Sequence, residues 1–284
     1  MSLVSSVITG IQARLSGGIT ISATSDPTQA AVLQWLNETA LWITGICAEN
    51  ESDLGRTIGT ITTIHADISA ATKAADCQIT ATSHGLMTTG TAEVLIKDVA
   101  GMTELNDTEF TATYVSGNAV TLGVASTAYT TYTSGGHVMK RKYSGLATTL
   151  YTPAQKGWIV DGHSRNPIDL STENSLFDYD PLEATEPMKF YVDGENNICF
   201  PSYPDDAYVV KIPYWRIPTS LTATTDTMPF LGLMDNVFIE AVTWRCQNRD
   251  EYDTSFELKW QSFLLDRCKR VIEMRKKMGV SVST

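Results

Sequence analysis

Apolar residues recur at intervals of three and four positions near the start of the chain, which is the spacing of one face of an α-helix. They are Val32, Trp35, Leu36, Ala40 and Ile43, with Thr39 at a matching position. Asp26-Pro27 precedes them and supplies a capping side chain followed by a proline, a residue common at the first helical position. We therefore predict a helix over about 27–46. After it, the alternation in TIGTITTIHADI indicates either a short strand or an irregular connector.

Between about 77 and 138 the pattern changes to short β-type segments separated by turn sequences. Thr, Gly, Val and Ala dominate, and four stretches have strand length and β-branched residues. These stretches are CQITATS, AEVLIKDV, EFTATYV and AVTLGVA. Because about 60 residues in roughly five or six strands can close a small barrel, we predict an all-β module over 77–138. Further along, Asp193-Gly194 and Pro204-Asp205 predict hairpins, and Pro213 predicts an edge position or a bulge in the strand over 208–215.

Two more helical stripes follow near the end of the chain. The first contains Leu231, Met234, Val237, Phe238, Ala241, Val242 and Arg245, and the second contains Phe256, Trp260, Phe263, Leu264, Arg267 and Val271. They predict helices over about 230–247 and 253–277, joined as an antiparallel hairpin by a short polar connector.

The predicted fold class is therefore α+β: N- and C-terminal helices forming a small bundle with a β-hairpin region, plus an inserted all-β small barrel. The predicted domains are 1–76 with 139–284 as the core, and 77–138 as the insertion.

The composition excludes several classes of protein. With 284 residues and 43% hydrophobic content, the chain can bury a sizeable core. It has no apolar run of about 18 residues for a membrane span, and its start lacks the pattern of a signal peptide. Its five cysteines are scattered without a C-x-x-C pair, so we expect neither a disulfide framework nor a zinc knuckle, as in a reducing cytoplasm.

The charge is negative overall but unevenly distributed. A formal charge of −11 argues against a protein that wraps nucleic acid. Between Asp161 and Asp206, eleven acidic residues face only Arg165 and Lys189, whereas residues 267–277 are strongly basic. Opposite signs suit head-to-tail assembly, although solvated faces explain such runs more often.

Motifs for catalysis are absent from the sequence. G-x-S-x-G, G-x-x-x-x-G-K-[ST], G-x-G-x-x-G and H-E-x-x-H do not occur. Asp161-Gly162-His163 has no activated serine or cysteine beside it, and Asp193–Asn197 suits a hairpin turn better than a calcium loop. We expect the four histidines to lie apart in structural or surface roles, with His84 stabilising a turn. No enzyme activity, cofactor or metal is predicted.

Interaction residues are therefore the remaining candidates. The candidate contacts with a partner ring are the basic residues Arg267, Lys269, Arg270, Arg275, Lys276 and Lys277, for which a solvated face is the alternative. The candidate contacts on the opposite side are Tyr203, Asp205 and Asp206, and core packing is the alternative for the aromatic residue.

The order of elements resembles that of head-to-tail adaptor proteins of tailed bacteriophages. The resemblance lies in Leu36-Asn37 of the first helix and in the pattern YxVxIxYxRxPxxL within YVVKIPYWRIPTSLTATTDTMPFLGLMDNVFIEAVTWR. It covers about residues 1–72 and 143–284. In that family a β-hairpin region is followed by an Asp-Thr segment and by helices that pack beside the N-terminal helix.

The inserted segment is similar to the small β-barrel called the FCCH domain of ubiquitin-activating enzyme, which also recurs in phage virion proteins. The matching positions are His84-Gly85-Leu86, Gly101-Met102-Thr103-Glu104-Leu105-Asn106 and Tyr132-Thr133-Ser134-Gly135-Gly136. Nothing else of ubiquitin activation is present, so this resemblance implies the fold and not the activity.

Together the resemblances imply a structural virion protein of the neck or tail, assembled in the host cytoplasm. Its partners would be eleven further copies in a dodecameric ring, the portal protein, the next tail or stopper component, and viral DNA passing without sequence-specific binding; no membrane is implied. The alternatives are a receptor- or glycan-binding tail or decoration protein, suggested by the Thr- and Gly-rich β segment and the aromatic residues, and a cell-wall hydrolase, which the missing motifs disfavour.

Overall fold

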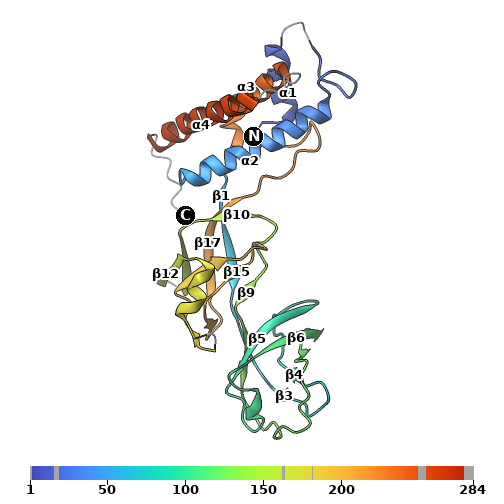
Figure 1. The fold of residues 1–284 in the computed structure, drawn as a ribbon, viewed down its shortest axis with the longest axis vertical. Helices are drawn as coiled ribbons and strands as arrows, with labels where there is room; N and C mark the ends of the chain where they lie inside the picture. Colours follow the sequence, from blue (N-terminus) through green and yellow to red (C-terminus); the bar gives the residue numbers. More distant parts are fainter. Residues whose placement is uncertain (1, 16–18, 162–163, 181, 249–253, 278–284) are drawn as a thin grey trace. The chain divides into compact units, whose positions relative to one another are not determined.

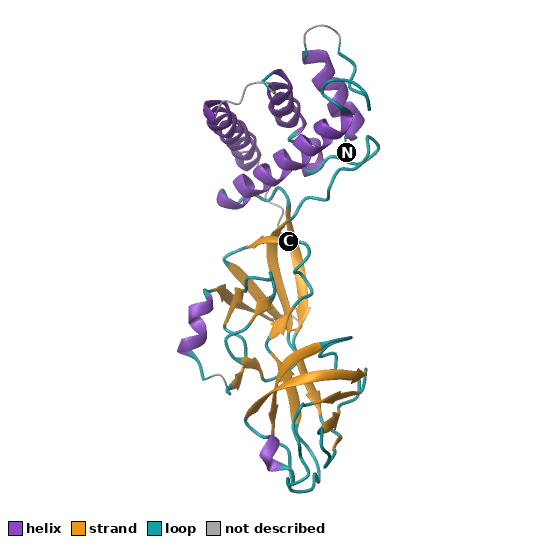
Figure 2. Cartoon of the chain, turned by 45° about the vertical axis from the view of Figure 1, so that its right-hand side comes forward, coloured by secondary structure: helices purple, strands orange, loops and turns teal. Residues whose placement is uncertain are grey.

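The structure is a computed structural model that describes residues 2–15, 19–161, 164–180, 182–248 and 254–277. The chain is a mixed α+β protein (Figures 1 and 2) and forms two compact units. Unit 1 contains Met1–Thr57, Thr149–Thr152 and Tyr214–Thr284, and unit 2 contains Ile58–Thr148 and Pro153–Pro213. Among the described residues, none of the helices has both the length and the apolar character that a membrane crossing needs.

Unit 1 is helical, and the described part of the chain contains four α-helices. They are α1 (Val4–Arg14), α2 (Gln29–Glu49), α3 (Asp235–Gln247) and α4 (Thr254–Lys277). Helix α3 contacts the other three, and α2 also contacts α4 (Figure 1). The three predicted helices are confirmed, whereas α1 was not predicted. Helix α2 begins later than the predicted cap at Asp26, because the side chain of Thr28 accepts a hydrogen bond from the Ala31 amide.

Most strands outside the barrel belong to an eight-stranded sheet with the order β1-β17-β11-β12-β14-β15-β9, in which β10 also pairs with β17. The strands are β1 (Arg56–Thr62), β9 (Lys142–Tyr143), β10 (Leu150–Pro153), β11 (Lys156–Asp161), β12 (Ser164–Leu170), β14 (Lys189–Val192), β15 (Ile198–Cys199) and β17 (Val209–Arg216). A separate pair joins β13 (Ala184–Thr185) to β16 (Tyr203–Pro204). The prediction of an edge position for Pro213 is wrong, because β17 lies between β1 and β11. The carbonyl oxygen of Pro213 accepts a hydrogen bond from the amide of Ala154, a residue between β10 and β11.

A second sheet of seven strands is nearly closed and barrel-like, with the order β2-β8-β5-β6-β7-β4-β3. The strands are β2 (Ile64–Asp67), β3 (Ala70–Ala71), β4 (Gln78–Thr80), β5 (Thr91–Lys97), β6 (Thr108–Ser116), β7 (Ala119–Thr121) and β8 (His137–Lys140). Its core includes Ile79, Val94, Ile96, Ala112, Val120 and Val138. The sheet begins at Ile64, well before the predicted boundary at 77, because β2 pairs with β8 along its whole length.

Residues from two of the three matching segments hold loops of this barrel. Gly101 has φ +84°, and a Cβ there would lie 2.1 Å from the carbonyl oxygen of Thr131. Asn106 bonds to both backbone groups of Val99. Nδ1 of His84 accepts a hydrogen bond from the Leu86 amide at 3.0 Å, which confirms the predicted turn role of His84.

Candidate functional site

Unit 1 joins α2 to the segment after β17 through a reciprocal pair of hydrogen bonds. Nδ2 of Asn37 donates to the carbonyl oxygen of Leu221 at 3.0 Å, and the amide of Leu221 donates to Oδ1 of Asn37 at 2.7 Å. Both residues belong to the patterns singled out in the sequence. The side-chain amide acts here as one more peptide group and fixes this segment on the helix.

The following segment is held by the N-terminal residues of the chain. Leu3 and Thr227 form an isolated antiparallel bridge, and the amide of Val4 donates to the carbonyl oxygen of Asp226 at 2.9 Å. The carboxylate of Asp226 accepts hydrogen bonds from the backbone amides of Thr222 and Ala223, which lower the pKa of Asp226. The Asp-Thr segment is therefore a structured connection between β17 and α3.

Below the surface of this unit, a buried cation–aromatic contact joins α3 to α4. The guanidinium carbon of Arg245 lies 3.9 Å from the ring centroid of Trp260, and Arg245 also pairs with Glu38 and Glu257. Nε1 of Trp260 donates to the carbonyl oxygen of Ala241 at 3.1 Å. The contact fixes the spacing of α2, α3 and α4.

Beside this contact, α2, Tyr151 of β10 and α4 enclose an apolar groove. The lining residues are Leu41, Trp42, Gly45, Ile46, Glu49, Tyr151, Leu258, Gln261, Ser262 and Leu265. Four of the large side chains are exposed: Leu41, Trp42, Tyr151 and Leu258, the last at 68%. Contiguous exposed apolar surface of this kind marks an interaction site more often than isolated surface hydrophobic residues do. We call these ten residues the α2–α4 groove.

The predicted basic contacts are not all free for a partner. Arg275 forms ion pairs with both carboxylate oxygens of Asp53, at 2.7 to 2.8 Å, and both side chains are largely buried. Nζ of Lys276 donates to the carbonyl oxygen of Asn50 at 3.0 Å. These two residues hold the end of α4 against the segment that follows α2, so their interactions are used within the chain.

The other basic residues are more accessible. Arg267 pairs with Glu240 at 3.2 Å, and Arg270 pairs with Asp266 on its own helix at 2.9 Å. Five basic residues of the run are exposed, namely Arg267, Lys269, Arg270, Lys276 and Lys277. The accessible positive charge on α4 is thus smaller than the sequence indicates.

The three predicted contacts at the opposite charge pole divide in the same way. Tyr203 is fully buried, and its hydroxyl donates to Glu109 at 2.8 Å, so its side chain is not available to another subunit. Burial, and then the bond to Glu109, raises the pKa of Tyr203 well above its ordinary value. Asp205 and Asp206 are exposed, and Asp205 accepts a hydrogen bond from Tyr208. Tyr203 is therefore a core residue, as the alternative prediction had it, whereas Asp205 and Asp206 lie on the surface and are accessible to a partner.

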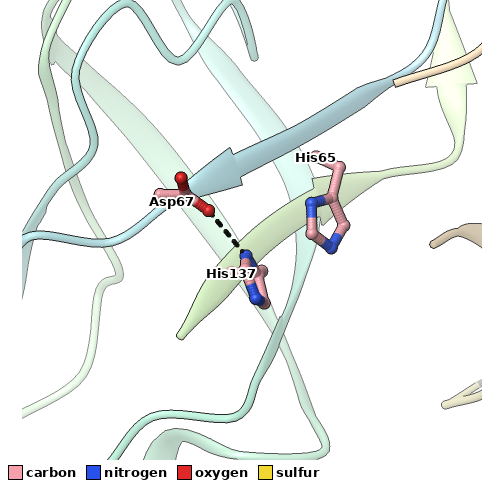
Figure 3. A group of neighbouring side chains, drawn as sticks. All are labelled: His65, Asp67 and His137. Atoms are coloured by element: carbon pink, nitrogen blue, oxygen red, sulfur yellow. Dashed lines mark ion pairs between the residues drawn. The ribbon is translucent and has the colours of Figure 1, made fainter. Parts of the chain in front are cut away.

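The expectation that the histidines lie apart is wrong for two of them. The rings of His65 and His137 have centroids 4.2 Å apart, and Nδ1 of His137 lies 2.9 Å from Oδ1 of Asp67 (Figure 3). Burial, followed by the nearby His137, lowers the pKa of His65 below its ordinary value. In the sequence, the only local signal was the spacing His65-x-Asp67 on a candidate strand. His163 and Gly162 lie outside the described residues.

All five cysteines are buried, and burial raises the pKa of the Cys47 thiol and of the Cys268 thiol to about 12. Thiols in this state are poor nucleophiles.

No family model matches the chain, and a search of curated proteins finds no relative.

Proposed function

We propose that this chain is a structural protein of a tailed-bacteriophage virion whose copies form a head-to-tail adaptor ring, a dodecamer, between the portal and the next tail or stopper component. The pairing of Asn37 with Leu221 carries the proposal. It joins the two parts of the adaptor-like pattern, which lie 184 positions apart, and the Asp-Thr segment follows directly. A contact between the two parts of the pattern supports the resemblance more than their order along the sequence does alone.

In this proposal, helices α1–α4 are the small bundle of the adaptor core, and the seven-stranded barrel is an FCCH-like insertion. The bridge between Ala100 and Ser134 supports the second assignment, because Ala100 directly precedes one of the three segments that carry the resemblance and Ser134 lies in another. Gly101 permits the close approach of these segments. The insertion contributes a fold and no ubiquitin chemistry.

The α2–α4 groove is the proposed contact with a neighbouring copy. A ring needs a heterologous interface, in which one surface of a subunit meets a different surface of the next. An exposed apolar groove on the helical unit suits one half of such an interface, and each interface of about 1,600 Å² is repeated around the ring. The chain then works by shape and repetition and catalyses no reaction.

The accessible charges are assigned to the two neighbours in the virion. Lys269, Arg270 and Lys277 of α4 face the portal, and Asp205 and Asp206 face the next tail component. The net charge of −11 suits a channel that lets DNA pass without holding it.

The proposal is tested with the full-length chain, alone and mixed with portal protein, by native mass spectrometry and negative-stain microscopy. Closed rings alone or on the portal are expected. Leu258→Glu, in the groove, should abolish rings, because it buries an unpaired charge in the subunit contact. Val115→Glu is the control, because Val115 is an exposed apolar residue of β6 (48%) outside the groove, and this variant should assemble normally.

A chain that stays solitary in the presence of portal, or that assembles equally well with either substitution, contradicts the proposal. An elongated trimer with glycan affinity would instead identify a receptor- or glycan-binding tail protein, and turnover of peptidoglycan would identify an enzyme.

A further inference from the structure

The cluster of His65, Asp67 and His137 lies on one face of the barrel-like sheet. His65 and Asp67 are two positions apart on β2, so their side chains emerge on the same face. In the register of β2 and β8, Asp67 lies opposite His137, and His65 lies opposite Met139, the next residue on that face. The backbone therefore places all three side chains at neighbouring positions, independently of their rotamers (Figure 3).

We propose that His65, Asp67 and His137 bind a divalent transition-metal ion of the Zn²⁺ class. Their ligand atoms all lie within 4.8 Å of one another. Ligand atoms of a tetrahedral zinc site are about 3.4 Å apart, since each bond is about 2.0–2.2 Å long. Side-chain rotations would have to bring the ligand atoms to this spacing when the ion binds. Two imidazoles and one carboxylate form a ligand set suited to borderline metals, with at least one position left for water.

The alternative is that His137 and Asp67 form an ordinary ion pair. Against it, Nδ1 of His137 is shielded from solvent and has no hydrogen-bond partner, although Oδ1 of Asp67 is only 2.9 Å away. A short contact whose geometry does not suit a hydrogen bond leaves a buried nitrogen unsatisfied, which costs free energy. A metal ion between the two atoms satisfies both.

The surrounding charges favour a cation. Asp205 and Asp206 act on His65 from the loop before β17, in addition to Asp67 on its own strand. Lys97 of β5 lies opposite His137, but its charge is balanced by Asp107 at 3.2 Å. Access is open, because Asp67 is 88% exposed and a groove beside β2 is lined by His65, Asp67 and Ala207.

A bound ion would join β2, at one end of the strand order, to β8. This inference does not depend on the proposed ring. It is tested with tag-free full-length protein, by calorimetric titration with ZnCl₂ and by melting with and without the metal. One Zn²⁺ per chain is expected, with a rise in the melting temperature that a chelator reverses.

Ligand variants and a matched control decide where the ion binds. His65→Gln, His137→Gln and Asp67→Asn should each weaken binding by at least about tenfold, whereas Glu93→Gln, an exposed carboxylate on β5, should leave it unchanged. X-ray absorption of the zinc-loaded wild-type chain should show nitrogen and oxygen ligands including imidazole. This readout needs no variant, so misfolding of a variant cannot obscure it. No stoichiometric binding, equal binding by every variant, or sulfur ligands would each overturn the inference.

Discussion

At the scale of single residues, Asn37 connects two distant parts of the chain, because its side chain forms hydrogen bonds with both backbone groups of Leu221. If a partly buried N–H group and a carbonyl group lose their partners, the free-energy cost exceeds the net stabilisation that the two hydrogen bonds provide. Leu221 is itself buried, so water does not easily replace the amide. Asn37 therefore couples the stability of α2 to that of the segment leading to α3.

Replacing Asn37 with alanine should lower the free energy of unfolding by about 2 kcal/mol, because two hydrogen bonds are lost and their partners stay in place. Urea denaturation followed by far-UV circular dichroism measures the change. Gln34→Ala is the control on the same helix, where an exposed side chain bonds to Glu38, and it should cost less than about 0.5 kcal/mol. Equal costs for the two substitutions would contradict the structural role of Asn37.

The residues that the sequence could not place depend on distant partners. The pattern marks Asn37, but its partner lies 184 positions away. His65 and His137 each stand alone in the sequence and meet only because β2 pairs with β8. Tyr203 lies in a turn-rich segment where the sequence leaves core packing and a subunit contact both open, and its burial beside Leu95 and Met139 decides between them. The local spacing of residues predicts which side of a helix or strand is apolar, whereas contacts between distant segments decide which residues pack against that side.

At the scale of elements, the β14–β15 hairpin shows how one carboxylate organises a turn. Oδ1 of Asp193 accepts hydrogen bonds from the amides of Glu195 and Asn197, both at 2.9 Å, which confirms the predicted turn. Its other oxygen lies 2.8 Å from Nζ of Lys142, on β9. Burial alone would raise the pKa of Asp193, but the bonds from Lys142 and Asn197 outweigh it and hold that pKa well below its ordinary value.

The lowered pKa of Asp193 predicts a specific loss of stability in acid. The ionised form is favoured by folding, so its contribution is complete above the ordinary pKa of 3.8 and is lost as the pH falls through the folded-state value. Asp193→Asn should lower the free energy of unfolding by about 2 kcal/mol at pH 7 and flatten its dependence on pH below about 4. Denaturant unfolding at a series of pH values measures both effects.

Asp169→Asn is the control for this prediction. Asp169 lies on β12 of the same sheet, and its ion pair with Lys156 is long, 3.9 Å, and exposed on both sides. Exposed pairs contribute little, so this variant should keep the wild-type pH profile. If the two variants showed the same profile, the acid sensitivity would have to arise elsewhere.

Long periodic elements were predictable, whereas short ones were not. The stripes of α2, α3 and α4 extend over several turns, and each of the three helices is found, although α3 begins at Asp235, five residues after its predicted start at 230. Helix α1 carries a similar signal in Val4, Val7, Ile8 and Ile11, all buried, but only over eleven residues. Strands such as β9, β13, β15 and β16 have two residues each, which is too short for any period to show.

At the scale of the whole molecule, neither unit is a continuous segment. The helical unit draws on three stretches of the chain, including Thr149–Thr152, which no helical pattern marks. The sequence predicts helical ends around β material, but the boundaries follow from contacts between distant strands. The same holds for the barrel, whose first strand precedes the predicted insertion because its partner is β8, close to the end of the insertion. Charge, in contrast, is a property of the whole chain that can be read directly.

The charge distribution predicts weak binding of DNA by the assembled protein. Eleven acidic residues against two basic ones between Asp161 and Asp206, and −11 overall, leave few cations to neutralise phosphates. Anisotropy of labelled duplex DNA at about 50 mM salt should therefore show no tight complex.

If the acidic region borders the DNA path, replacing exposed Asp205 and Asp206 together with lysine should create an affinity that falls steeply with salt. Replacing Glu93 and Asp107 of the barrel with lysine changes the net charge by the same amount, and this control should not create such an affinity for DNA. Tight, salt-sensitive binding by the wild-type protein would exclude a low-friction channel, and equal effects of the two double variants would show that only net charge matters.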